Sequence, residues 1–145
     1  MIVRGESESV CPFNRFAKET AWKEFHPESG VGPRLDLVEV LSIATDEEFR
    51  ARFKGTPLTR PKRRGLLRNA AVAAANIDCT AAVPVLIERA EHDPEPLIRS
   101  HVVWALAQLD SKRASPIIER ALKDPDPMVR DEATRLISDD NMVND

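Results

Sequence analysis

A run of basic residues lies between two acidic parts of the chain. Residues 49–77 carry eight Lys or Arg and no Asp or Glu, whereas residues 1–48 sum to −5 and residues 78–145 to −6. Arginine offers a phosphate two parallel donors, and several such contacts release counterions, which makes binding strong at low salt. The segment therefore predicts contact with a nucleic-acid backbone. The alternatives are a solvated run of charge or internal ion pairs with the acidic flanks.

The candidate contact residues stand around the start of an alanine-rich segment, Leu66–Asn76, which we expect to be a helix. They are Arg60, Lys62, Arg63, Arg64, Arg68 and Asn69. The first four precede the expected helix, whose N-terminal dipole and free backbone N–H groups also favour an anion. Asn69, in its first turn, could donate to a phosphate or read a base edge.

Other residue types that perform chemistry are few and scattered. The two cysteines, Cys11 and Cys79, are expected to be free thiols, and Cys79 to be a small buried residue at a turn between helices. No histidine is placed as a base beside either, so no catalytic residue is predicted. His101 and Trp104 share one helical face, which favours packing and leaves contact with RNA or a cofactor as the alternative.

The basic segment opens a repeat with a period of 31 residues. An apolar residue followed by arginine recurs at Arg68, Arg99 and Arg130. Apolar residues follow each arginine at helical spacing and should face the core: Ala71, Ala74, Ala75, Val102, Ala105, Leu106, Ala133, Leu136 and Ile137. Units of this length that bury their apolar faces against neighbours form a solenoid.

Acidic residues accompany the repeated arginines. Asp93 and Asp124 stand six residues before Arg99 and Arg130, which suggests a ladder of ion pairs between repeats. At the same offset Arg68 is preceded by Lys62, so we expect Arg68 to be freer to face a ligand.

Further helices are expected on either side of the alanine-rich segment Leu66–Asn76. Thr45 and Glu48 form a capping box that starts a helix ending near Phe53, with Phe49 and Phe53 as an i, i+4 pair facing inward. Thr80 is placed to cap a helix that runs to about Glu91. The remaining expected helices cover about Leu35–Ile43, a segment that Asp93 is placed to cap and that ends at Leu109, Arg113–Lys123, and a final helix after the Asp124 to Pro127 motif. No strand-like alternation is present, so the predicted class is all-α, with about three helical hairpins.

Three parts of the chain are expected. Residues 1–33 form an irregular N-terminal segment, residues 34–138 the helical domain, and residues 139–145 a disordered acidic tail. No apolar run reaches the roughly 18–20 residues that span a bilayer, and no signal-peptide pattern is present. The sequence therefore predicts a cytoplasmic protein with no membrane contact.

The repeat resembles the short HEAT-like repeat over Gly65 to Ser138. A further set of motifs resembles the C-terminal part of epoxyqueuosine reductase: Cys11-Pro12-Phe13-Asn14-Arg15-Phe16, Gly55-Thr56-Pro57-Leu58, Arg63-Arg64-Gly65-Leu66-Leu67-Arg68-Asn69 and His101-x-x-Trp104-Ala105-Leu106. That family reduces epoxyqueuosine to queuosine in the anticodon loop of tRNA. The resemblance implies a HEAT-like region that helps to hold tRNA beside a catalytic part with cobalamin and two [4Fe-4S] clusters.

The chain departs from that family where the clusters are bound. In the family the Cys-Pro closes a ferredoxin-type pattern, but Arg4 and Ser7 stand here at the spacings of the preceding cysteines. Cys11 is therefore expected to be a vestigial ligand or one completed by a companion catalytic chain, and no cofactor is expected in this chain alone.

The sequence thus predicts a tRNA-binding HEAT-like module that engages the anticodon stem-loop and is not catalytic alone. A small HEAT adaptor that binds a protein partner through its concave face is the alternative. A stand-alone iron–sulfur protein is a third interpretation.

Overall fold

The computed structural model describes residue 12, residues 21–23 and residues 34–143. The chain divides into two units, residues 1–34 and residues 35–145. The predicted irregular segment, apart from Pro12 and residues 21–23, and the candidate ligand Cys11 lie outside the described residues. None of the described helices is both long enough and apolar enough to cross a membrane.

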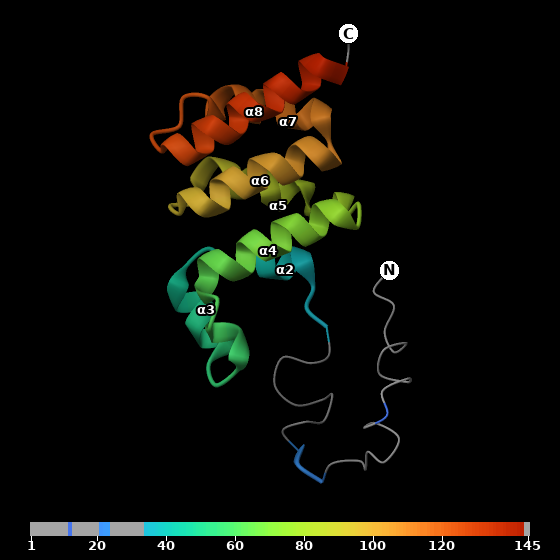
Figure 1. Ribbon diagram of the computed structural model, residues 1–145. Helices are drawn as coiled ribbons and strands as arrows, with labels where there is room; N and C mark the ends of the chain where they lie inside the picture. Colours follow the sequence, from blue (N-terminus) through green and yellow to red (C-terminus); the bar gives the residue numbers. More distant parts are fainter. Residues whose placement is uncertain (1–11, 13–20, 24–33, 144–145) are drawn as a thin grey trace. The chain divides into compact units, whose positions relative to one another are not determined.

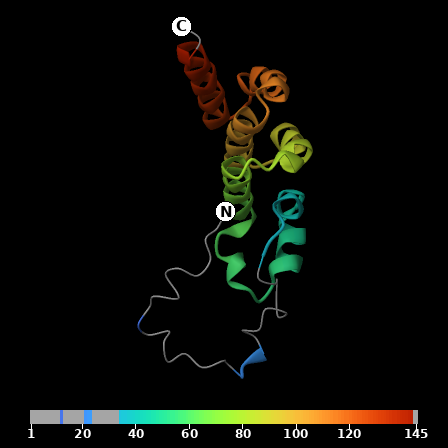
Figure 2. The same ribbon diagram turned by 90° about the vertical axis from the view of Figure 1, so that its right-hand side faces the viewer.

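The second unit consists of helices. They are α2 (Leu37–Leu41), α3 (Asp46–Phe53), α4 (Lys62–Asn76), α5 (Val83–His92), α6 (Pro96–Leu109), α7 (Ser111–Ala121) and α8 (Pro127–Val143), with short 3-10 turns at Pro57–Thr59 and Thr80–Ala82. Helices α4, α6 and α8 stack as one layer, and α2, α5 and α7 form a second layer beside it (Figures 1 and 2). Residues 34–143 contain no strand, so the predicted all-α solenoid is confirmed.

The 31-residue period places the same positions in the core of each repeat. Leu67, Ile98 and Val129, which precede the repeated arginines, are at most 1% exposed. The apolar residues that follow the arginines are buried as well, except Ile137, which is 39% exposed. Each repeat therefore buries its stripe between the two layers and against the neighbouring repeats.

Two local predictions about α3 are confirmed. The Thr45 hydroxyl accepts from the Glu48 amide at 3.1 Å, while the Glu48 carboxylate accepts from the Thr45 amide, which completes the capping box. Phe49 and Phe53 are buried with ring centroids 5.1 Å apart. After α3, Gly55 takes φ +78, a left-handed conformation that glycine adopts without a steric penalty, and the chain turns toward α4.

Three predicted boundaries are wrong. Thr80 does not cap α5: it begins a 3-10 turn, and α5 starts at Val83 with no side-chain cap. Asp93 does not occupy the N-cap of α6, which is Glu95, although its carboxylate accepts from the Glu95 amide at 3.0 Å. The residues 139–143, placed in the disordered tail, continue helix α8.

Candidate nucleic-acid interface

Helix α4 carries the predicted cations, and it begins earlier than predicted. Its first residue is Lys62, so three of the cations lie inside its first turn rather than before it. No acidic residue and no side-chain N-cap compensates this positive end, where the helix dipole disfavours cations. The start of α4 is therefore a concentration of positive charge that a bound anion would relieve.

One of the predicted contact residues, Arg63, points into the protein. Arg63 is only 4% exposed. Its guanidinium forms an ion pair with Asp93, in which Nη1 donates to Oδ1 at 3.2 Å. Its Nε donates to the Ile43 carbonyl at 3.0 Å. Arg63 is therefore a structural residue that fixes α4 to the turn before α6, and it leaves the set of candidate phosphate contacts.

The position of Arg63 has a signal in the sequence that charge counting misses. Arg63, Leu67 and Ala71 follow one another at i, i+4 and i+8 on the buried face of α4. Arg64 and Arg68 follow the same spacing one residue later, and Arg64 is exposed while Arg68 is half-buried. Helical periodicity applied to the arginines as well as to the apolar residues would have separated the two sets.

Most of the other cations of the basic segment stay available for contact with a phosphate. Arg50 and Arg52 pair with Glu47 and Glu39. By contrast Arg60, Lys62 and Arg64 are exposed and form no ion pair with any carboxylate within the described ranges.

Arg68 and Asn69 form a joint polar group one turn after Arg64. The Arg68 Nε and Nη2 donate to the Asn69 Oδ1 at 3.1 and 2.8 Å. The amide nitrogen of the exposed Asn69 side chain, together with the remaining guanidinium donor, can therefore face the same ligand. The structure thus brings Lys62, Arg64, Arg68 and Asn69 together on α4, with Arg60 just before it.

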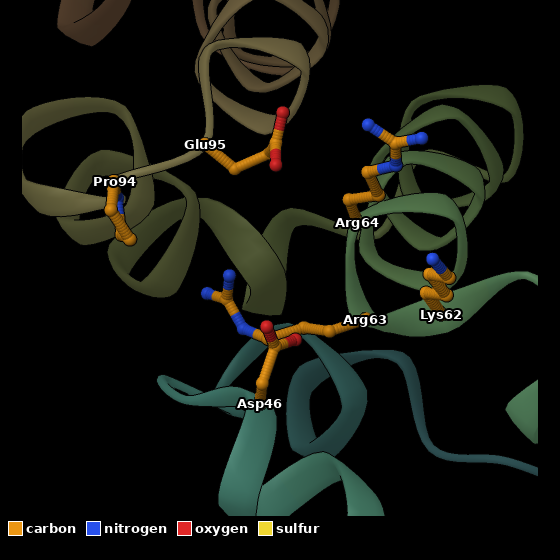
Figure 3. Close-up of a pocket in the computed structure, with 6 residues that line it drawn as sticks. All are labelled: Asp46, Lys62, Arg63, Arg64, Pro94 and Glu95. Atoms are coloured by element: carbon orange, nitrogen blue, oxygen red, sulfur yellow. The ribbon is translucent and has the colours of Figure 1, made fainter.

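A hollow of about 360 Å³ opens at the start of α4 (Figure 3). Its walls carry both charges: Asp46, Lys62, Arg63, Arg64, Pro94 and Glu95 line it. Lys62 and Arg64 stand on the α4 side, while the Arg63 side chain runs back from α4 across the hollow. Charge composition does not reveal the two carboxylates at this hollow, because Asp46 begins α3 and Glu95 precedes α6, far from α4 in the sequence. Since carboxylates repel phosphate, a phosphate would contact the outer surface of α4 rather than the inside of the hollow.

The predicted ladder of ion pairs is only partly formed, because of the three repeated arginines only Arg99 makes an ion pair with a carboxylate in the part of the chain that the structure describes. Arg99 pairs with Asp124 of the following repeat through bonds of 2.8 and 2.7 Å. The aspartate six residues before each arginine contributes its backbone carbonyl instead, from Asp93 to Arg99 and from Asp124 to Arg130. Arg68 and Asp93 stand 31 residues before Arg99 and Asp124, so the repeat would pair them in the same way. Asp93 pairs with Arg63 instead. Arg68 therefore remains outside the ladder.

The Arg99–Asp124 rung makes stability sensitive to acid. The pKa of Asp124 lies below its ordinary value, mainly because its carboxylate accepts a hydrogen bond from Arg99. Burial raises this pKa, but the hydrogen bond from the Asp126 amide lowers it further. This stabilisation is present above the unfolded pKa, near 4, and is lost as the pH falls through the lower folded pKa. We expect Asp124→Asn to reduce the unfolding free energy by about 1–3 kcal/mol at neutral pH.

Urea unfolding at a series of pH values checks this prediction. The difference between the wild type and Asp124→Asn should shrink as the pH falls below about 4, because the wild-type carboxylate is then protonated as well. A difference that stays constant down to the lowest pH would show that the ion pair contributes nothing.

The described residues hold no group of three or more His, Cys, Asp or Glu that could bind a metal ion. Cys79 is a free thiol in the turn after α4, half-buried rather than fully buried as predicted. The proposed ligand role of Cys11 stays a prediction, and no chemical step can be assigned to an iron–sulfur cluster from these residues.

Comparison with known proteins gives the family. The sequence pattern of HEAT repeats matches residues 60–138, more than half of the chain. The epoxyqueuosine reductase of Pseudomonas aeruginosa is 37% identical over 101 residues, and that of Bacillus subtilis is 29% identical over 106 residues. Each match covers 70% of this chain but only 27% and 26% of the relative. The chain thus spans about a quarter of the length of these relatives.

Solved structures agree with the sequence matches. The crystal structure of an epoxyqueuosine reductase with an epoxyqueuosine-modified stem loop of tyrosine tRNA superposes with a TM-score of 0.77 at 27% identity. It covers 90% of this chain and 34% of the other. A structure of the Bacillus subtilis enzyme superposes with a TM-score of 0.76 at 27% identity, and the match covers 90% of this chain and 35% of the other. The chain therefore belongs to the HEAT-repeat family, and its helical region is homologous to the HEAT-like region of epoxyqueuosine reductases.

Proposed function

We propose that this chain is a tRNA-binding HEAT module of the epoxyqueuosine reductase type, which grips the phosphates of an anticodon stem-loop. The observation that carries the proposal is the exposed positive charge at the start of α4. There Lys62 and Arg64 are exposed without a carboxylate partner among the described residues, and Arg68 lies one turn further on. The tRNA stem loop bound to a similar structure supports this choice of ligand.

The cations are arranged for a backbone rather than for one small anion. Arg64 and Arg68 are four residues apart, so their guanidinium groups project from the same face of α4 about 6 Å apart along the axis. Each guanidinium can give a phosphate two parallel hydrogen bonds. The acidic groups Asp46 and Glu95 line the hollow behind Arg64 and would keep the polyanion on the outer surface of the helix.

The solenoid holds the phosphate-binding cations of α4 in a fixed position. The buried Arg63–Asp93 pair links the start of α4 to the segment before α6, so the cations of α4 keep a fixed position relative to the second repeat. The reduction itself would belong to cobalamin and iron–sulfur clusters of a catalytic region, in the same or a companion chain. In this proposal the module acts by positioning the tRNA.

Titration of a fluorescently labelled tRNA anticodon stem-loop at several salt concentrations tests the proposal. About four phosphate contacts give a slope of about −3 in log K against log salt, or roughly 50-fold weaker binding between about 50 and 200 mM salt. We expect micromolar-range binding, near −8 kcal/mol, at the low-salt end. No binding of the stem-loop at low salt, together with capture of a protein partner, would show an adaptor instead.

A further inference from the structure

A second hollow lies on the layer formed by α4, α6 and α8. It has a volume of about 280 Å³ and is lined by Val72, Ser100, His101, Trp104, Glu132 and Arg135. This volume falls just below the roughly 300–1,000 Å³ of sites for drug-sized ligands. The hollow therefore suits a single flat group rather than a larger molecule.

The repeat register explains why the indole stays partly open. Ala73, Trp104 and Arg135 are spaced by 31 residues and occupy the same position in three successive repeats. The alanine on α4 is too short to cover its large neighbour, so Trp104 and His101 both remain half-exposed. A flat aromatic surface with an open side is what unpaired bases use for stacking.

The imidazole of His101 presents a defined edge to the hollow. Its Nδ1 lies 3.0 Å from the Leu97 carbonyl and 3.2 Å from the Ser100 hydroxyl. Because a carbonyl can only accept, the Nδ1 carries a proton and donates to Leu97, and in this tautomer Nε2 is the acceptor. A base amino group could donate to that atom.

The charges at the rim favour a neutral ligand. Arg135 pairs with Glu132 and lies 3.5 Å from a carboxylate oxygen of Asp139, so its charge is already compensated. A phosphate would gain little there, whereas a neutral base would meet an apolar surface with polar edges. Val72 follows Arg68 by one helical turn, about 6 Å along α4, so a strand held at Arg68 has its neighbouring bases beside the hollow.

We propose that this hollow receives one unpaired nucleobase from the loop of the bound RNA, which stacks on the indole of Trp104 beside His101. The inference rests on the proposed function, because the phosphates at Arg64 and Arg68 bring the loop to this surface. The hollow would add a site for a base to the proposed contacts with the RNA phosphates. The module should therefore prefer an RNA loop to a fully paired duplex.

Tryptophan fluorescence tests the inference directly. The chain has two tryptophans, so Trp22→Phe leaves Trp104 as the single reporter. Titration with the unlabelled anticodon stem-loop should quench its emission, whereas a duplex of equal length and charge should not. In the labelled titration, Trp104→Ala should weaken binding about 5- to 150-fold, the range for loss of one stacked base, and Trp104→Phe should stay near the parent.

Matched histidines provide the second comparison. His101→Ala should weaken stem-loop binding, whereas His92→Ala, an exposed histidine on α5 in the other layer, should leave it unchanged. Circular dichroism melts establish that each variant is folded. If Trp104→Ala fails to fold, the quenching experiment still decides the question.

The outcomes separate the two proposals. Stem-loop binding with a normal salt slope but without quenching or loss in Trp104→Ala would overturn the base site and leave the tRNA-binding proposal intact. Absence of any stem-loop binding at low salt would overturn both. Equal quenching by duplex and stem-loop would also contradict an unpaired base.

Discussion

Replacement of Asp93 by alanine is expected to lower the unfolding free energy by about 3–5 kcal/mol. The Asp93 side chain is fully buried between two buried guanidinium groups, that of Arg63 and that of Arg89 at 3.7 Å. Without the carboxylate Arg63 loses its counter-charge and Arg89 keeps only its pair with Glu88, so two buried cations lie close together, and the Glu95 amide loses its acceptor. Urea unfolding followed by circular dichroism measures the loss.

An exposed aspartate gives the matched control. Asp131→Ala on α8 removes the same charge from the surface and should change the unfolding free energy by at most about 0.5 kcal/mol. Combining Asp93→Ala with Arg63→Ala should cost less than the sum of the two single changes, because the pair is already broken. Strict additivity would mean that the two groups do not stabilise each other.

Reversal of two charges on the outer face of α4 is expected to weaken tRNA stem-loop binding about 100-fold. Arg64→Glu with Arg68→Glu removes two charged contacts, each worth about 1.5 kcal/mol at the low end, and a factor of ten corresponds to about 1.4 kcal/mol. The slope of log K against log salt should also become shallower by about 2. Anisotropy titration of the labelled stem-loop measures both quantities.

A second double variant separates local contact from net charge. Lys112→Glu with Arg113→Glu makes the same change in net charge, but both residues are exposed on α7, in the other layer. It should retain most of the affinity and nearly the full salt slope. Equal losses in the two double variants would mean that the protein attracts RNA only through its overall charge, and the proposed interface would be wrong.

The fold was predictable because its rule is local and repeated. The 31-residue register identified α4, α6 and α8 and many of their buried positions, though not Ala70, Ser100 or Val103, and the capping box located α3. The errors fall where tertiary contacts decide. Asp93 has the sequence of a cap, but its carboxylate serves an ion pair with a residue 30 positions away.

The site was predictable in its location and less so in its members. Charge composition directed attention to residues 49–77, yet it could not distinguish Arg63 from Arg64, whose chemistry is identical. That distinction depends on which side of α4 meets the second repeat. The Trp104 hollow depends on Val72 of α4 and Arg135 of α8 lining it with the indole, which only the assembled layer brings together.

Neighbouring positions on α4 serve separate tasks. Successive residues on a helix point about 100° apart, so Arg63 is held in the interior while Arg64 reaches the solvent. Under the proposed function, substitutions on the outer stripe should therefore change the affinity for RNA without disturbing the packing of the repeats. In an engineered descendant the specificity of this module could be redesigned on one face of a helix, with the scaffold left as it is.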